Sequence, residues 1–109
     1  MSVRLYFWQR LTAAVMAPMI LVHLAIIFYA TRRGLSAADI LARTRGSTLW
    51  FLFYGAFVLA AAVHASIGTR NVLAEWSPLK EKECGILAAL LGILLFVLGL
   101  RAIVAVVFR

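Results

Sequence analysis

The stretch TLWFLFYGAFVLAAAVHASIG, residues 48–68, decides the class of fold, because it is an apolar run long enough to cross a lipid bilayer. Inside a bilayer the backbone must satisfy its own hydrogen bonds, so the run is predicted to be a helix. It carries no charged side chain and a single histidine, His64, near its end. A polar group at membrane depth is costly without a partner, which makes His64 the first candidate functional residue.

Two further runs have the same character: FWQRLTAAVMAPMILVHLAIIFYA from residue 7 and GILAALLGILLFVLGLRAIVAVVF from residue 85. The composition agrees, since 65% of the 109 residues are hydrophobic and a soluble domain of this size could not bury so much apolar surface. We therefore predict an all-α membrane protein, residues 1–109 as a single transmembrane domain, with helices at about 7–30, 48–71 and 85–108.

The connections between the runs are short and leave no room for a separate domain. In the first, SAAD has the form of a capping box and predicts a short interfacial helix. Pro18 is expected to kink the first span, because proline removes a backbone hydrogen bond. The lone Cys84 cannot form an internal disulfide and is interpreted as a small residue at a helix start.

The formal net charge of +7 does not indicate a nucleic-acid partner. The basic residues are dispersed around the apolar runs and are interpreted as flanks that contact lipid headgroups and water. Their numbers balance on the two sides of the predicted membrane, so charge alone does not orient the chain.

His64 shares one helix face with Gly68, Asn71 and Glu75. Two interpretations stay open. His64 could ligate haem iron, with the flat porphyrin lying against the small Gly68, or it could make an interhelical hydrogen bond as a neutral imidazole. Arg70 follows about 9 Å further along the helix axis, within reach of a haem propionate or of the headgroup region.

His23, in the first span, is the apparent second ligand, but its depth argues against that role. Measured from the same membrane face, His23 lies about 22 Å deep and His64 about 10 Å. Two axial ligands of one haem should lie at similar depth, so a second ligand is expected from elsewhere. His23 is predicted to hydrogen-bond internally, or to serve a second haem or a quinone pocket nearer the other face.

Arg10, Arg70, Glu75 and Trp76 fall at one membrane end if the helices alternate in direction. They either snorkel to lipid phosphate or form a polar pocket for a ligand at the interface. Arg101 lies deeper, towards the other end, and is interpreted as snorkelling or partner-facing.

The stretch HASIGTRNVLAEW, residues 64–76, is similar to the haem-ligand helix of the D-type hydrophobic membrane anchor subunit of succinate dehydrogenase, respiratory complex II. The family pattern is a histidine, a glycine four residues later, an apolar pair and an acidic–aromatic pair. Here these are His64, Gly68, Val72-Leu73 and Glu75-Trp76. The first span agrees, since RLTAA carries the family's arginine–x–threonine–alanine start at Arg10, Thr12 and Ala13.

The resemblance implies that the chain is half of a heterodimeric anchor bundle and is not catalytic alone. The family's D-type anchor pairs with a C-type anchor and docks an iron–sulfur subunit and a flavoprotein subunit on the cytoplasmic face. A haem b lies between the anchors, with one histidine from each, so His64 would be an axial ligand of the iron. Arg10 would lie near the quinone that receives the electrons. The implied location is the bacterial inner membrane, with the N-terminus cytoplasmic.

Two positions depart from the D-type pattern. Trp76 stands where the family usually has a quinone-contacting tyrosine, although an indole N–H can still donate a hydrogen bond. Arg70 resembles the C-type motif histidine–x–x–x–glycine–x–arginine, so the chain mixes features of the two anchors.

Three alternative functions stay open at this point. One is a fumarate reductase anchor of the same architecture, and another is a haem-free structural anchor in which His64 only hydrogen-bonds. The third is a small multidrug-type transporter, which usually needs four spans and an intramembrane carboxylate. The predicted spans contain no Asp or Glu, which counts against the transporter.

Overall fold

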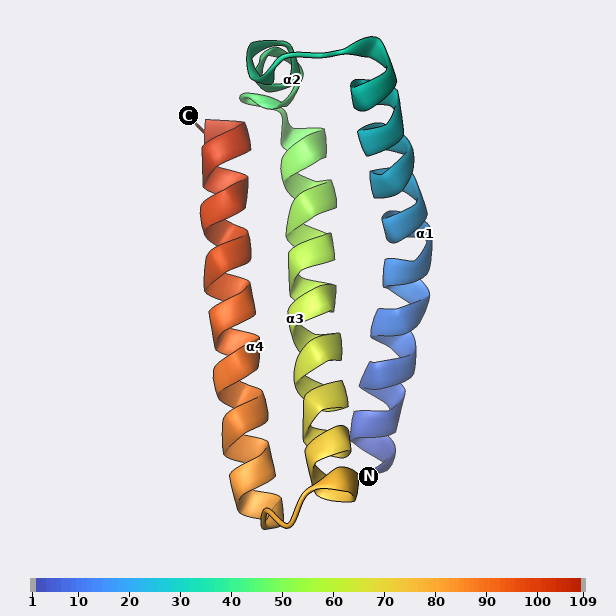
Figure 1. The fold of residues 1–109 in the computed structure, drawn as a ribbon, viewed down its shortest axis with the longest axis vertical. Helices are drawn as coiled ribbons and strands as arrows, with labels where there is room; N and C mark the ends of the chain where they lie inside the picture. Colours follow the sequence, from blue (N-terminus) through green and yellow to red (C-terminus); the bar gives the residue numbers. More distant parts are fainter. Residues whose placement is uncertain (1, 109) are drawn as a thin grey trace.

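The computed structural model describes residues 2–108 and contains three helices long and apolar enough to cross a membrane. They are α1 (Val3–Arg33), α3 (Thr48–Trp76) and α4 (Glu81–Ile103), the last extended by a π-helical segment, η1 (Val104–Phe108) (Figure 1). A short helix, α2 (Ala37–Thr44), joins α1 to α3. The described residues form no strand, so the predicted all-α membrane fold is confirmed.

The long helices extend beyond the predicted apolar runs. At the start of α1 the Ser2 hydroxyl accepts a hydrogen bond from the amide of Leu5, and Gly34, with φ of 64°, ends the helix. The predicted boundaries fall short at both ends of α1, at the end of α3 and at the start of α4, because apolar residues mark membrane depth, whereas capping groups mark helix ends. As a result Glu75, Glu81 and Glu83 lie in terminal turns of helices, outside the predicted spans.

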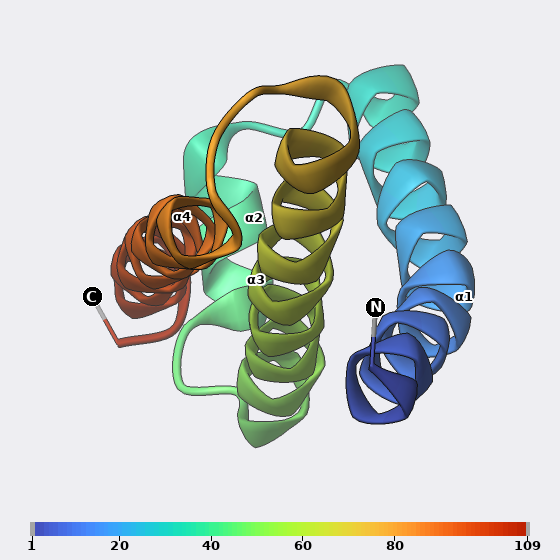
Figure 2. The same ribbon diagram turned by 90° about the horizontal axis from the view of Figure 1, so that it is seen from below.

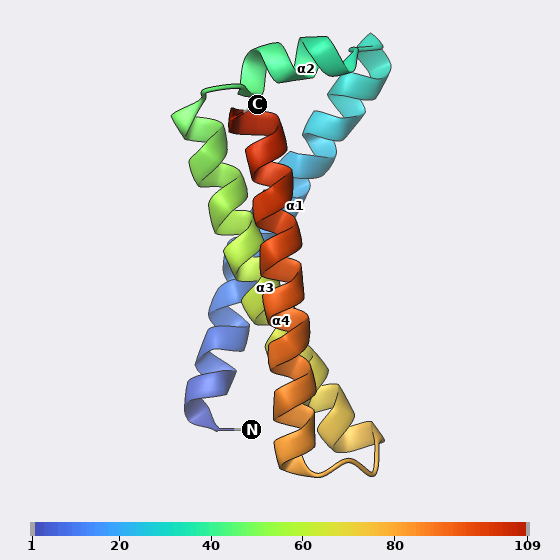
Figure 3. The same cartoon turned by 90° about the vertical axis from the view of Figure 1, so that its left-hand side faces the viewer.

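The capping box predicted for the first connection is present at the start of α2. The Ser36 hydroxyl accepts from the amide of Asp39 at 3.1 Å, and the Asp39 carboxylate accepts from the amide of Ser36 at 2.9 Å. The bond from the backbone amide of Ser36 to the carboxylate, and then the Ser36 hydroxyl beside that carboxylate, lower the pKa of Asp39. Figure 3 shows α2 lying across one end of the bundle.

Residues at and just after the C-terminal end of α2 are hydrogen-bonded to η1. The Thr44 hydroxyl donates to the carbonyl of Val106 at 2.7 Å, and the amide of Gly46 donates to the carbonyl of Val107 at 2.6 Å. Helix-terminal carbonyls have no partner within their own helix, so these two donors satisfy groups that would otherwise be orphaned.

Pro18 does not interrupt α1, which remains one continuous helix of 31 residues. Proline has no N–H, so the carbonyl of Ala14 receives no backbone hydrogen bond there. Figure 1 shows α1 curved along its length and without a break.

Helix α3 lies in the middle, with α1 and α4 on opposite sides of it (Figures 1 and 2). Its contact with α4 is the closer one, and three glycines of α4 spaced by seven residues line it: Gly85, Gly92 and Gly99. Ser66 of α3 donates a hydrogen bond to the carbonyl of Ala88 at 2.9 Å across the same contact. Small residues allow two membrane helices to approach this closely.

The interior is small and built mostly of small side chains, such as Ala60, Ala62 and Ala88. Large apolar side chains remain exposed on all three long helices, among them Leu21, Phe28, Leu59, Leu90 and Ile93. In water this surface would be unstable, whereas lipid or partner helices can cover it.

Candidate functional site

His64 lies on α3 where that helix contacts α1, and it is half-buried. Its Nδ1 is 3.1 Å from the hydroxyl oxygen of Thr12 on α1. That hydroxyl also lies 2.7 Å from the carbonyl oxygen of Trp8 and 3.1 Å from that of Gln9. The other imidazole nitrogen, Nε2, has no hydrogen-bond partner among residues 2–108.

Gly68, one turn after His64, also faces α1. A Cβ placed on Gly68 would lie 3.3 Å from Nε2 of Gln9, so the Gln9 side chain takes the space that the glycine leaves. The carboxamide oxygen of Gln9 is buried and has no hydrogen-bond partner within the described chain. The space beside Gly68, which the haem interpretation gives to the porphyrin, is therefore filled by the Gln9 side chain, whose oxygen is not held by a hydrogen bond.

His23 lies far from His64 along the bundle. Its ring packs edge-on against Tyr54 and Phe57 of α3, at centroid distances of 5.9 and 5.6 Å, whereas His64 meets Thr12. Thr12 and His23 are separated by about 16 Å along α1. The structure thus keeps the two histidines at different levels, as the depth argument predicted.

The expected internal hydrogen bond of His23 is not present at Nδ1, which is buried without a partner among the described residues. His23 lines a largely apolar cavity of about 510 Å³ together with Tyr29, Arg43, Thr44, Trp50 and Tyr54. This cavity lies at the α2 end of the bundle, away from His64.

Arg70 points towards α4, away from His64. Its guanidinium forms an ion pair with Glu81 at 2.9 Å, and its Nε lies 3.9 Å from the Cβ position of Gly85. Six residues along a helix correspond to a rotation of about 240°, so His64 and Arg70 lie on different faces of α3. The contact of Arg70 with a haem propionate stays a prediction, and in this structure Glu81 is its partner.

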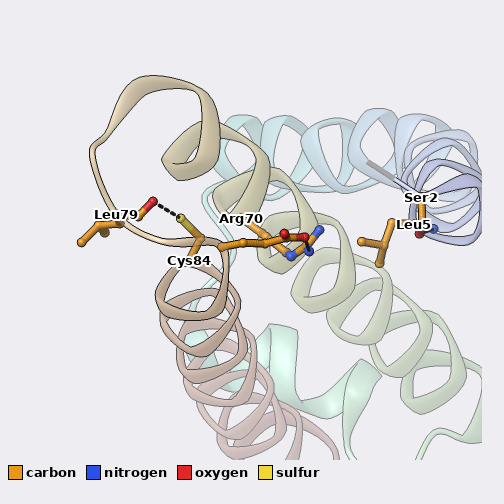
Figure 4. Close-up of polar contacts among 6 residues, drawn as sticks. Ser2, Leu5, Arg70, Leu79 and Cys84 are labelled. Atoms are coloured by element: carbon orange, nitrogen blue, oxygen red, sulfur yellow. Dashed lines mark hydrogen bonds and ion pairs between the residues drawn. The ribbon is translucent and has the colours of Figure 1, made fainter.

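A polar cavity of about 400 Å³ opens at this end of the bundle, between the start of α1, the end of α3 and the start of α4. Figure 4 shows Arg70 between Ser2 and Leu5 on one side and Cys84 on the other. Asn71 and Glu75 also line the cavity. The Cys84 thiol is fully buried and donates to the carbonyl of Leu79 at 3.8 Å, which fits its predicted structural role.

Arg10 and Trp76, the two residues predicted near the quinone, do not line this cavity. Arg10 is exposed on α1, with its guanidinium 5.7 Å from the centre of the Tyr6 ring. Trp76 is the last residue of α3 and is 83% exposed. Both are open to lipid or to a partner. Arg101, predicted to snorkel or face a partner, is also exposed.

Sequence reasoning did not identify Thr12, Gln9 and Glu81 as neighbours of the candidate site. Thr12 and Gln9 are three residues apart and so share one face of α1, and this spacing could have predicted that both contact the same neighbouring helix. Their partners depend on how α1 is rotated against α3, and the sequence carries no mark of that rotation. Residues 2–108 contain no cluster of three or more His, Cys, Asp or Glu side chains that could hold a metal ion.

Three membrane-crossing helices in an open arrangement, with a histidine at a helix contact and a polar cavity at one end, define a small α-helical membrane subunit. Residues 2–100 match the family model described as succinate dehydrogenase/fumarate reductase transmembrane subunit, so the chain belongs to this family. A search of curated proteins and a search of solved structures each found no match. The resemblance to the succinate dehydrogenase family seen in the sequence is confirmed at the level of this transmembrane-subunit family.

Proposed function

We propose that this chain is the D-type membrane anchor of a succinate:quinone oxidoreductase and that His64 provides one axial ligand of a haem b. Family membership makes the chain a membrane subunit of an enzyme complex. One observation carries the haem assignment: Nδ1 of His64 is held by Thr12, while Nε2 has no partner among the described residues. A hydrogen-bonded Nδ1 with a free Nε2 is the usual arrangement of a metal-ligating histidine.

The residues present fit one half of a haem site. His64 is half-buried at the edge of an open arrangement of helices, and His23 lies at another level. The second axial ligand would therefore come from a partner subunit, in agreement with the proposed C-type anchor. When bound, the haem supplies reversible one-electron transfer. Gln9 can move from the space beside Gly68 without breaking a hydrogen bond of its oxygen.

The quinone is proposed to bind at the end of the bundle that holds the N-terminus. Arg10 and Trp76 are the predicted contacts there, and the polar cavity adds Arg70 and Glu75. The cavity offers hydrogen-bond donors and acceptors, which suit a quinone headgroup because its two carbonyls accept hydrogen bonds. The charged groups around the cavity can also hold the protons that quinone reduction consumes.

The partners proposed for the chain are a second anchor, an iron–sulfur subunit and a flavoprotein subunit. The large apolar side chains left exposed on α1 and α4 support a second anchor, since a membrane partner can cover them. With the N-terminus in the cytoplasm of a bacterium, the polar cavity and His64 lie towards the cytoplasmic face. They are then on the side where the iron–sulfur subunit would dock.

The test is a dithionite-reduced-minus-oxidised spectrum of the complex purified through this chain, with its subunits identified by mass spectrometry. A sharp b-type α band, its loss in His64→Ala, and co-purification of a second anchor, an iron–sulfur protein and a flavoprotein support the proposal. An unchanged band in His64→Ala refutes the ligand assignment. Co-purification of these subunits without a haem band would support the haem-free structural anchor. Absence of these subunits would support the small multidrug-type transporter instead.

A further inference from the structure

The single proton of the Thr12 hydroxyl is already used in a hydrogen bond to a backbone carbonyl of α1. Thr12 is 6% exposed, and its oxygen lies 2.7 Å from the carbonyl oxygen of Trp8 and 3.1 Å from that of Gln9. A carbonyl oxygen accepts hydrogen bonds and never donates them, so a contact of 2.7 Å between the two oxygens requires the hydroxyl proton between them. Donation to a carbonyl one turn earlier is a common choice of threonine in a helix.

The hydrogen bond that the Thr12 hydroxyl donates determines the tautomer of His64. The hydroxyl oxygen can meet Nδ1 at 3.1 Å only as an acceptor, so Nδ1 must carry the imidazole proton and donate it. A neutral imidazole has one N–H, and its proton on Nδ1 leaves Nε2 with a free lone pair. The lone pair of Nε2 is what a metal ion requires from a neutral histidine.

We propose that Thr12 is a positioning residue that holds His64 in the Nδ1–H tautomer and presents Nε2 as the ligand. The inference rests on the proposed function, because it assigns a role at the same haem site. Thr12 does not touch the iron and acts through His64. Because Thr12 belongs to α1 and His64 to α3, the hydrogen bond also fixes the ring orientation relative to two helices.

The chain offers a matched control in Thr44, the other buried polar residue that the structure describes. Thr44 is 8% exposed and likewise donates to a backbone carbonyl, that of Val106 at 2.7 Å. It lies at the opposite end of the bundle, so replacing it removes a buried hydroxyl without affecting His64. Thr12→Val and Thr44→Val therefore differ in their relation to the haem ligand.

The experiment compares Thr12→Val, Thr12→Ala, Thr12→Ser, Thr44→Val and His64→Ala in the whole purified complex. The readouts are haem content, the midpoint potential of the haem and the electron paramagnetic resonance spectrum of the ferric low-spin form. Loss of the hydroxyl in Thr12→Val or Thr12→Ala should weaken haem retention about 10- to 100-fold, the usual effect of removing such a supporting bond, and should shift the potential and the spectrum. Thr12→Ser should restore all three, and Thr44→Val should leave them unchanged.

Wild-type haem content, potential and spectrum in both Thr12→Val and Thr12→Ala, with haem lost in His64→Ala, would overturn the role of Thr12 and leave the proposed function standing. A Thr12→Ser variant as impaired as Thr12→Val would also overturn it, because the hydroxyl would then not be the group that matters. Unchanged haem in His64→Ala would instead overturn the proposed function. If Thr12→Val does not assemble, Thr12→Ala and Thr12→Ser decide the question.

Discussion

Gly99 is the position where a single methyl group should disturb the bundle most. A Cβ added there would lie 2.8 Å from Cγ2 of Val58 and closer still to its Cγ1, and non-bonded carbon atoms do not approach this closely. Valine on a helix has one strongly preferred rotamer, so Val58 has little freedom to turn aside. Gly99→Ala must therefore push α4 away from α3 or strain the Val58 side chain.

The three glycines of the α3–α4 contact form a graded series for this test. At Gly92 a Cβ would lie 3.0 Å from the Cβ of Ser66, and at Gly85 it would lie 3.9 Å from Arg70, an ordinary contact with a flexible side chain. The higher helix propensity of alanine stabilises a helix interior by about 1 kcal/mol relative to glycine, and overpacking destabilises a packed contact by about 1–3 kcal/mol. The conflict at Gly99 is severe, so its cost should lie at the upper end of that range and Gly99→Ala should destabilise by about 2 kcal/mol after the gain is subtracted. Gly92→Ala should change the stability little, and Gly85→Ala should stabilise slightly.

The assay is the temperature at which half of the purified complex is lost, followed on native gels after heating. We expect the order Gly85→Ala at or above wild type, then Gly92→Ala, then Gly99→Ala lowest. Val58→Ala in the Gly99→Ala background should recover most of the loss, because it removes the colliding methyl groups. Wild-type stability in Gly99→Ala, or a further loss when Val58→Ala is added to Gly99→Ala, would refute the collision between Gly99 and Val58.

Three further predictions follow from named residues. His23→Leu should leave the haem spectrum intact, because His23 lies about 16 Å along α1 from Thr12, and a lost band would contradict the separation of the two histidines. Arg10→Ala should impair quinone reduction more than electron transfer to a soluble dye, and equal loss of both activities would indicate an assembly defect. Arg32→Ala is the matched control, since Arg32 stacks on Phe28 at the opposite end of α1 as Arg10 stacks on Tyr6. Because the folded-state pKa of Asp39 lies below its ordinary value of 3.8, the ionised carboxylate stabilises α2 above that pH, and this contribution is lost as pH falls through the folded pKa. Amide exchange of residues 37–44, corrected for the intrinsic rate at pH 5 and pH 3, should show this loss in the wild type, and Asp39→Asn should abolish the pH dependence.

Features that depend on local sequence could be predicted well. The three membrane spans follow from the length of the apolar runs, because lipid requires each run to satisfy its own backbone. The α2 capping box follows from Ser36 and Asp39 alone, since both of its hydrogen bonds are made within four residues. The different levels of His23 and His64 follow from helical rise and antiparallel order.

The sequence by itself thus determined the membrane class, the order of the helices and the family resemblance, and it singled out His64 as the candidate ligand. Only the tertiary structure decided which faces of the helices meet. It paired His64 with Thr12, filled the space beside Gly68 with Gln9, and turned Arg70 towards Glu81. The physical reason is that a helix in lipid is apolar on every side, so no apolar stripe marks the packed face as it does in a soluble protein. Rotation about the helix axis is set by small residues and hydrogen bonds on neighbouring helices, and those contacts exist only in the folded bundle.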